Sequence, residues 1–242
     1  MNLLSEIVAW LSDPAHWTGP DGMLPRLGEH VALSAGCIIL AGLIALPLGL
    51  YIGHTGRGAT LAIGISNIGR ALPTLAILGI VLTLTANLLP PYGFFLIPTV
   101  AALTALAIPP IVTNTYAGLR EVDPEALEAG RGMGMREIQL LRQVEIPLAV
   151  SAILAGLRIS AVQVVATATL AAVLGAGGLG RLIIDGIAQH DDAQLLMGAL
   201  LVALLSIGTE LAFAWLQRRA VSPGLRPTGW PAADASADAR FA

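Results

Sequence analysis

The amino-acid sequence predicts an all-α membrane protein with about five transmembrane helices. Hydrophobic residues make up 55% of the 242 positions, charged residues only 12%, and the mean hydropathy is +0.77. Long segments contain no Asp, Glu, Lys or Arg, and the longest of them covers 71–119. A soluble helical core would need polar faces at a spacing of 3.6 residues, and these segments show none. Because a bilayer core about 30 Å thick needs roughly 20 apolar residues per helix, the segments are long enough to span it.

Five transmembrane spans fit the apolar pattern best, at 31–53, 69–89, 94–117, 148–172 and 193–216. The start of the second span is left open, because Arg70 and Pro73 lie there and the preceding residues 54–68 could extend it as an amphipathic turn. The second and third spans come from one apolar run, which Pro90-Pro91-Tyr92-Gly93 interrupts where a turn is needed.

One membrane domain, residues 31–219, accounts for most of the chain. The segment 1–30 is expected to lie outside or at the membrane surface, with a short interfacial helix in residues 1–11. The last segment, 220–242, is rich in Pro, Ala, Ser and Asp, which predicts a disordered cytoplasmic tail. The single cysteine, Cys37, lies inside the first span and offers no disulfide or metal-binding framework.

The basic residues predict the orientation of the chain in the membrane. All 13 are arginine. In the five-span arrangement one side holds Arg57, Arg70, Arg120, Arg131, Arg136, Arg142, Arg218, Arg219 and Arg226. The opposite loops hold only Arg26 and Arg181, among several acidic residues. The positive-inside rule therefore places the amino terminus outside, and the loop 118–147 and the carboxy terminus in the cytoplasm.

The segment Asp123–Pro147 is a charged island between two apolar runs. Its charged side chains are Asp123, Glu125, Glu128, Arg131, Arg136, Glu137, Arg142 and Glu145. Asp123-Pro124-Glu125 is a favourable helix start, because Asp caps free amides, Pro fits the first position and Glu suits the positive end of the helix dipole. Three glycines, Gly130, Gly132 and Gly134, then predict a bend before a second helix at 136–144, with Pro147 starting the fourth span. Two short helices joined in this way form a knob that can fit a cleft in a partner protein.

The island resembles the EAA loop through which bacterial ABC importer permeases meet their ATPase. The family pattern is Glu-Ala-Ala, three residues, Gly, nine residues, then Ile-x-Leu-Pro. Here it reads Glu128-Ala129-Gly130, three residues, Gly134, nine residues and Val144-Glu145-Ile146-Pro147. Gly130 replaces the second Ala and is expected to loosen the end of the first helix. The resemblance implies ATPase contacts at Glu125, Glu128, Ala129, Gly130, Gly132, Met133, Gly134 and Met135.

A wider resemblance covers about residues 31–217. The segments 114–135 and 167–180 are similar to permeases of the glycine betaine, carnitine and choline uptake group. The D-methionine permease group is the main alternative, since it also has five spans and a GGLG segment. The Gly132–Met135 and Thr167–Thr169 runs favour the quaternary-amine group. This resemblance implies a type I ABC importer fold that works by alternating access.

The same resemblance implies the partners and the location. They are two cytoplasmic ATPase subunits, a second permease subunit in a homo- or heterodimer, an external substrate-binding protein and the lipid bilayer of the bacterial inner membrane; no nucleic acid is expected. The chain shows no catalytic constellation and no Walker-type phosphate loop, so it is not expected to be an enzyme. No cofactor is expected in this chain, and ATP with Mg²⁺ is expected in the partner ATPase. A self-sufficient secondary transporter is a second alternative, although it would leave the charged island unexplained.

A glycine-rich turn follows the fourth span. Gly175 to Gly180 formally match the dinucleotide pattern G-x-G-x-x-G, but no strand precedes them, so nucleotide binding is not expected. The resemblance to permeases places this turn near the external gate, with Gly175, Gly177, Gly178 and Gly180 as candidate gate residues. The uncharged polar residues Asn67, Asn114 and Gln163 are candidates to line a transport path, or to form interhelical hydrogen bonds.

Besides Arg70 at the start of the second span, two charged residues fall inside predicted spans. Arg158 is expected to reach the cytoplasmic interface or to pair with Glu145, and Glu210 is expected to pair near Arg218. Both interpretations treat the charges as structural, although charges buried in membrane spans are often functional.

Overall fold

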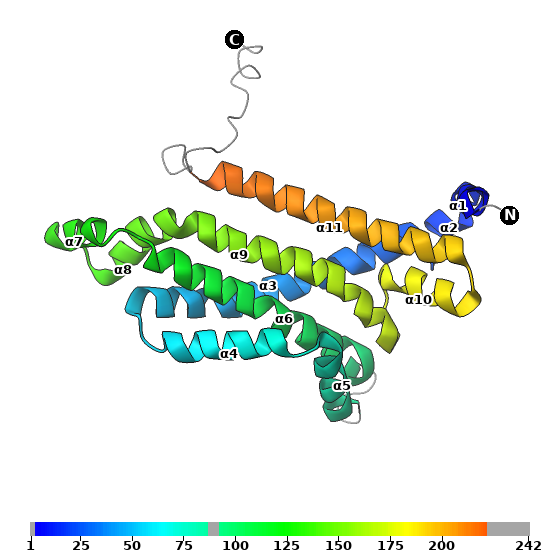
Figure 1. Ribbon diagram of the computed structural model, residues 1–242, viewed down its shortest axis with the longest axis horizontal. Helices are drawn as coiled ribbons and strands as arrows, with labels where there is room; N and C mark the ends of the chain where they lie inside the picture. The colour runs from blue at the N-terminus through cyan, green and yellow to red at the C-terminus, as the bar shows by residue number, and fades with distance from the viewer. Residues whose placement is uncertain (1–2, 87–91, 222–242) are drawn as a thin grey trace, which may run out of the picture.

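The computed structural model describes residues 3–86 and 92–221, which fold into helices with no strand among them (Figure 1). The elements in chain order are α1 (Leu3–Ser12), α2 (Ala15–Thr18), α3 (Met23–Thr55), α4 (Ala59–Ala71), α5 (Thr74–Thr85), α6 (Tyr92–Arg120), α7 (Pro124–Gly132), α8 (Glu137–Leu140), the π turn η1 (Leu141–Glu145), α9 (Ile146–Thr167), the 3₁₀ segment η2 (Ala168–Leu174), α10 (Gly180–Gln189) and α11 (Asp192–Ala220). The all-α prediction is confirmed.

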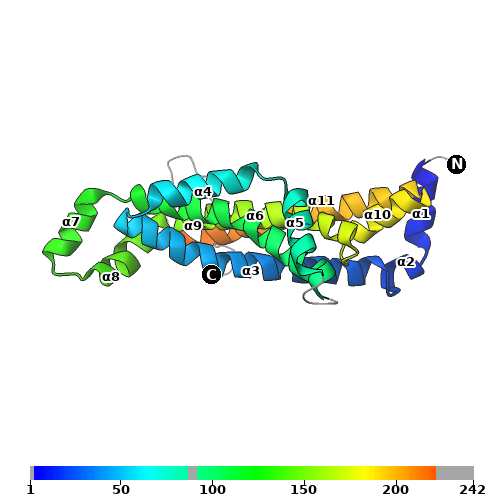
Figure 2. The ribbon, with the colours of Figure 1, turned by 90° about the horizontal axis from the view of Figure 1, so that it is seen from below.

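The long helices α3, α6, α9 and α11 run along the long axis of an elongated bundle (Figure 1). The short helices α7 and α8 project from one end of it, whereas α1, α2 and α10 gather at the other end (Figure 2). The central core lies where α3, α6 and α9 meet, with buried residues such as Ala41, Ala107, Ile111 and Val164. The charged island and the glycine-rich turn therefore lie at opposite ends of one bundle.

Small residues allow the core helices to pack closely. A Cβ atom added at Gly49 of α3 would lie 2.7 Å from the Cβ of Thr115 in α6. One added at Gly118 would lie 2.5 Å from the Cβ of Ala152 in α9. Such contacts bring helix backbones together where lipid supplies no hydrophobic drive between them.

The outward face of the bundle is apolar and exposed. Leu43 of α3 is 70% exposed, and Leu204 and Leu211 of α11 are 54% and 60% exposed. Side chains of this kind are unfavourable in water but match the hydrocarbon interior of a bilayer or a second apolar subunit.

Four helical segments within the described residues are long and apolar enough to cross a membrane. The first of the predicted spans starts earlier than expected, because α3 begins at Met23 rather than at residue 31. In this extension Arg26 pairs locally with Asp21 and Glu29, and Glu29 makes a tertiary contact by accepting a hydrogen bond from the amide of Gly178.

The second span, predicted at 69–89 with its start left open, is not one continuous helix. The structure places two helices there, α4 and α5, which meet at an angle of 94°. Pro73 causes the break, because it has no amide hydrogen to donate and forces the preceding Leu72 into an extended conformation, with φ −78° and ψ 126°. Counted as one broken span, this pair gives five spans in total.

The predictions for the amino-terminal segment and for the carboxy-terminal tail have different outcomes. A helix is present in the first segment as α1, and Trp10 packs it into a second core with α10 and α11. The predicted disordered tail falls almost entirely on residues 222–242, which lie outside the described residues. Pro90 and Pro91 of the predicted turn also lie outside them, whereas Tyr92 and Gly93 belong to α6.

Candidate functional site

The charged island folds into two arms joined by a glycine bend. The side chain of Asp123 caps α7 by accepting a hydrogen bond of 2.8 Å from the amide of Glu125, with Pro124 in the first turn. After Gly132 the chain turns at Gly134, whose φ of +80° is the left-handed conformation that glycine adopts without strain. The amide of Arg136, which precedes α8, donates to Gln139 Oε1 at 2.9 Å. The predicted helix, bend and helix are therefore present.

Gly130 does not loosen the first arm, contrary to the expectation from the missing second Ala. The helix α7 continues through it to Gly132. Gly130 is buried, and a Cβ atom there would lie 2.7 Å from Cδ1 of Leu140 and 3.3 Å from Sδ of Met135. The absence of a side chain at position 130 lets α7 approach α8, which offsets the low helical propensity of glycine.

The second arm and the fourth span are one continuous helical rod, whereas the sequence predicted two separate helices. α8, η1, α9 and η2 follow one another without a break from Glu137 to Leu174. Pro147 lies in the first turn of α9 and cannot donate a backbone hydrogen bond. The π turn directly before it widens the helix, which accommodates the proline without ending the rod.

The tip of the island presents apolar side chains among charged ones. Met133 is 77% exposed and Ile138 is 52% exposed. Glu125, Glu128, Ala129, Gly132 and Gly134 are exposed beside them, while Met135 is half-buried. The carboxylate of Glu137 accepts from Arg131 Nε at 3.2 Å and raises the pKa of that guanidinium. The structure thus brings the predicted contact residues together on one projecting surface, apart from Gly130, which is buried.

A polar network that the sequence analysis did not anticipate joins the island to α3. Nδ1 of His54, in the last turn of α3, lies 2.6 Å from Oε2 of Glu145 in the π turn. Its Nε2 lies 3.5 Å from Oε2 of Glu137. The only sequence signal was a glutamate placed just before an apolar span, and nothing in the pattern pointed to a partner 91 residues away.

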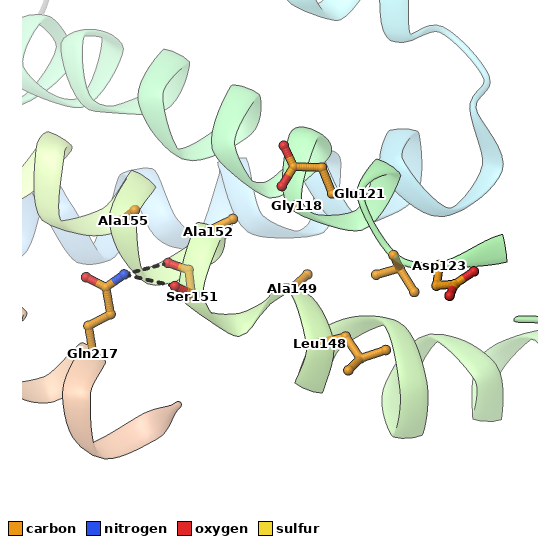
Figure 3. Close-up of a pocket in the computed structure, with 10 residues that line it drawn as sticks. Gly118, Glu121, Asp123, Leu148, Ala149, Ser151, Ala152, Ala155 and Gln217 are labelled. Carbon is orange, nitrogen blue, oxygen red and sulfur yellow. Dashed lines mark hydrogen bonds between the residues drawn. The ribbon is translucent and has the colours of Figure 1, made fainter. Parts of the chain in front are cut away.

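A hollow of about 430 Å³ opens beside the island, between the end of α6, the start of α9 and the end of α11 (Figure 3). On its α11 side, Gln217 Nε2 donates to the carbonyl and to the hydroxyl of Ser151 at 3.0 and 3.1 Å. Glu121 and Asp123 lie on the side of α6 and the island (Figure 3). Gln217 thus fastens the end of α11 to α9 next to the base of the island.

The glycine-rich turn at the opposite end is held by the start of α3. Gly175 and Gly178 have φ values of +86° and +91°, so the predicted tight turn is present. Oε2 of Glu29 accepts from the amide of Gly178 at 2.7 Å and from Arg26 Nη1 at 2.9 Å. A hollow of about 280 Å³ lies beside this contact and is lined by Glu29, Leu33, Phe95, Leu96, Thr99 and Gly175 to Gly177.

Further contacts fix the surroundings of the glycine-rich turn. Nε2 of the buried His30 donates to the carbonyl of Val165 at 2.9 Å. Gly180 begins α10 and is buried against the backbone of Thr169. Arg181 and Asp185 form an ion pair of 2.6 Å within α10. The four candidate gate glycines therefore lie in one turn that is anchored to α3 rather than free.

The three candidate path residues do not form one cluster. Asn67 is exposed on α4, and Gln163 is half-buried on α9. Asn114 lies in α6, and its amide donates to the carbonyl of Pro110 in the same helix at 2.8 Å. The hydrogen bonds in the described part of the chain do not join these side chains to one another.

The charges inside the spans pair differently from the prediction. Nη1 of Arg158 in α9 lies 3.5 Å from Oε1 of Glu210 in α11. Glu145, the expected partner of Arg158, contacts His54 instead. The two helices pack side by side, and this proximity between segments distant in the sequence determines the pairing.

Comparison with known proteins assigns the chain to a family. Residues 45–222 match the family described as "Binding-protein-dependent transport system inner membrane component". The chain is 35% identical over 223 residues to the carnitine transport permease protein OpuCB of Listeria monocytogenes, covering 92% of this chain and 97% of that protein. It is 36% identical over 204 residues to the choline transport system permease protein OpuBB of Bacillus subtilis (strain 168), covering 84% and 91%.

A solved structure with the same fold is an inward-facing MetNI methionine ABC transporter. Its matching chain has a TM-score of 0.74 and 24% identity, with 87% of this chain and 100% of that chain covered. The protein described here therefore belongs to the family of inner-membrane components of binding-protein-dependent transport systems, the permease subunits of ABC importers.

Proposed function

We propose that this chain is the permease subunit of an ATP-driven importer for small quaternary-ammonium osmoprotectants of the glycine betaine, choline and carnitine type. The proposed substrate class rests on the similarity of this chain to its relatives over nearly their whole length. The relative named for carnitine transport is 35% identical over 97% of its own length. A second relative, 36% identical, is named for choline transport. Carnitine and choline share a trimethylammonium group, so this group is the common chemical feature of the proposed substrates.

The island Asp123–Pro147 is the proposed contact with the ATPase. Its proposed contact residues are Glu125, Glu128, Ala129, Gly130, Gly132, Met133, Gly134 and Met135. Gly130 is buried, so its proposed role is indirect: it allows α7 to pack against α8. The exposed Met133 and Ile138 support this assignment, because apolar side chains at a projecting tip gain stability when a partner covers them. ATP and Mg²⁺ belong to the partner, and this chain converts closure of the ATPases into movement of helices.

The proposed orientation places the island in the cytoplasm and the glycine-rich turn outside. The arginines of the island, with Arg57, Arg120, Arg218 and Arg219, lie at one end of the long helices. The other end holds Asp21, Glu29, Asp191 and Asp192 with fewer arginines. This asymmetry is that of the positive-inside rule. The external binding protein would then deliver substrate near Gly175–Gly180, the proposed gate, and a second permease subunit would complete the pathway.

The alternative of a D-methionine or other amino-acid permease has less support. The likeness to the methionine transporter is at 24% identity, which carries information about fold and none about substrate. A self-sufficient secondary transporter would leave the projecting island without a partner to bind.

Uptake measurements test the proposed function. The chain is expressed with its ATPase and binding protein in a bacterial strain that lacks osmoprotectant uptake. We expect ATP-dependent accumulation of radiolabelled glycine betaine, choline or carnitine, and no accumulation of methionine. Accumulation of methionine alone would overturn the proposed substrate class, and uptake that persists without the ATPase would overturn the importer assignment.

A further inference from the structure

A largely buried polar pair ties the charged island to the first membrane-spanning helix. The side chain of Glu145 is only 5% exposed and that of His54 only 14% exposed. Their atoms Oε2 and Nδ1 lie 2.6 Å apart, a distance at which the imidazole N–H donates to the carboxylate. A carboxylate is stable in such a place only when a partner compensates for its lost hydration, and His54 is that partner.

The pair is the inner end of a longer polar chain. Nε2 of His54 also faces Oε2 of Glu137 at 3.5 Å, and Glu137 accepts from Arg131 at 3.2 Å. The four groups join α7, α8, the π turn and α3. The outer pair, Arg131 and Glu137, is about half exposed and contributes little by itself. The buried contact between His54 and Glu145 is therefore the strong part of this connection.

Glu145 lies where the helix leaves the island and enters the bundle. It is the last residue of the π turn Leu141–Glu145. π turns are rare and often occur at functional sites, because the extra residue in the turn re-aims the side chains that follow. Here the turn coincides with the largely buried contact to a different helix, which is a second observation that sets Glu145 apart from the other charges of the island.

The connectivity gives this contact a specific mechanical meaning. Any displacement of α8 passes directly into α9, because the rod from Glu137 to Leu174 is continuous. The helix α3 has no such covalent connection, since after Thr55 the chain turns at Gly56 and Gly58 into α4. Beside the apolar packing of Leu46 and Leu50 against the start of α9, His54 and Glu145 provide the direct polar contact through which the same displacement reaches the last turn of α3.

The packing next to His54 would carry the displacement further. A Cβ atom added at the preceding residue, Gly53, would lie 2.9 Å from the Cβ of Leu119 in α6. One helical turn deeper, a Cβ atom added at Gly49 would lie 2.7 Å from the Cβ of Thr115 in α6. Helices in such close contact move together, because tightly packed interfaces do not deform continuously.

We propose that His54 and Glu145 are positioning residues that transmit movement of the charged island to α3, so that α3, α6 and α9 rearrange together during the transport cycle. The proposal rests on the proposed function, because it assigns a route for coupling between ATPase and permease. It goes beyond the EAA-type loop by naming a residue outside that loop, His54, as part of the coupling machinery.

The test replaces the histidine in two ways in the complete reconstituted complex. His54→Leu removes the donor, whereas His54→Asn keeps an amide donor at the position of Nδ1. We expect His54→Leu to assemble with the ATPase and hydrolyse ATP, while the amount of substrate transported per ATP falls roughly tenfold. His54→Asn should restore most of this ratio. Thr55→Ala, which removes only exposed hydrogen bonds at the end of the same helix, is the matched control.

A double variant separates coupling from folding. His54→Leu with Glu145→Leu removes both polar groups, so no uncompensated buried charge remains and the complex should assemble. We expect it to stay uncoupled. Transport per ATP at the wild-type ratio in His54→Leu or in the double variant would overturn the proposal. A proportional loss of assembly, ATP hydrolysis and transport that His54→Asn does not relieve would also overturn it.

A measurement that needs no substrate keeps this proposal distinguishable from the proposed function. A fluorescent probe is attached to Arg57→Cys in the turn directly after α3, in a Cys37→Ala background. ATP should change the probe signal in the otherwise wild-type complex and not in His54→Leu. An unchanged response in His54→Leu contradicts the proposal, whereas failure of the wild-type complex to transport quaternary-ammonium compounds contradicts only the assigned substrate.

Discussion

Gly130 of α7 lies directly against Leu140 of α8, and this contact holds the two arms of the charged island together. Leu140 is fully buried, and a methyl group at position 130 would lie 2.7 Å from its Cδ1 atom. The family pattern has alanine at this position. The glycine found here leaves room for the large side chain of Leu140 on the opposite arm.

Replacing Gly130 with valine should separate the two arms. The added side chain would overlap Leu140 and Met135, and overpacking of this kind costs about 1–3 kcal/mol. We expect less ATPase to co-purify with the Gly130→Val permease, although the permease still inserts into the membrane. Gly64→Ala in α4 is the control, because it lies outside the island and no atom lies within 4 Å of its added methyl group. Equal co-purification of Gly130→Val and wild type would show that the contact is unimportant.

The bend at Gly134 should tolerate asparagine and reject valine. Its φ of +80° costs a β-branched residue about 1–2 kcal/mol, whereas asparagine enters this conformation more readily. Gly134→Val should re-aim α7 and lower uptake by about tenfold at normal membrane insertion, and Gly134→Asn should stay near wild type. Uptake in cells, normalised to permease in the membrane, measures this difference; similar loss in both variants would point to contact with the partner rather than to backbone conformation.

A substitution in the glycine-rich turn should lower uptake without weakening the contact with the ATPase. A methyl group at Gly177 would overlap the carboxylate of Glu29, whose Cδ atom would lie 2.7 Å away. Gly177→Ala should therefore break the hydrogen bond from Gly178 to Glu29 and lower uptake, with ATPase co-purification unchanged. Gly36→Ala on the same helix as Glu29 has open space around it and serves as the control. Normal uptake with Gly177→Ala, or with Gly177→Val, would remove this turn from the gate.

The pair of Arg158 and Glu210 predicts non-additive effects on stability. Each single leucine variant leaves one charge of α9 or α11 without its partner 3.5 Å away, whereas the double variant removes both. We expect Arg158→Leu and Glu210→Leu each to lower the melting temperature of the purified permease, and the double variant to recover part of the loss. The interaction free energy should be about 1 kcal/mol. Strict additivity would show that the two side chains do not interact in the folded protein.

Much of the fold follows from local patterns in the sequence. The apolar runs place α3, α6, α9 and α11, and Asp123-Pro124 together with Gly134 place the arms and the bend of the island. These features depend on residues close together in the chain, so composition and spacing are sufficient to predict them.

The features that the sequence did not predict depend on contacts between distant segments. The pairing of His54 with Glu145 and of Glu29 with Gly178 joins residues 91 and 149 positions apart. The early part of α3 takes part in the second of these contacts through Glu29. The sharp bend at Pro73 was visible as a proline, but its angle is set by the packing of α4 and α5 against α6.

ATP-dependent uptake into proteoliposomes measures whether this chain forms the pathway of an ATP-driven importer. The permease is reconstituted with its ATPase and binding protein, and glycine betaine, choline and carnitine are offered in turn. We expect uptake of at least one of them with ATP and none with a non-hydrolysable analogue. We also expect Glu128→Lys, at the exposed face of α7, to weaken ATPase association or uptake while the permease still inserts. Uptake that needs no ATP, or wild-type ATPase association and uptake in Glu128→Lys, would contradict the proposed function.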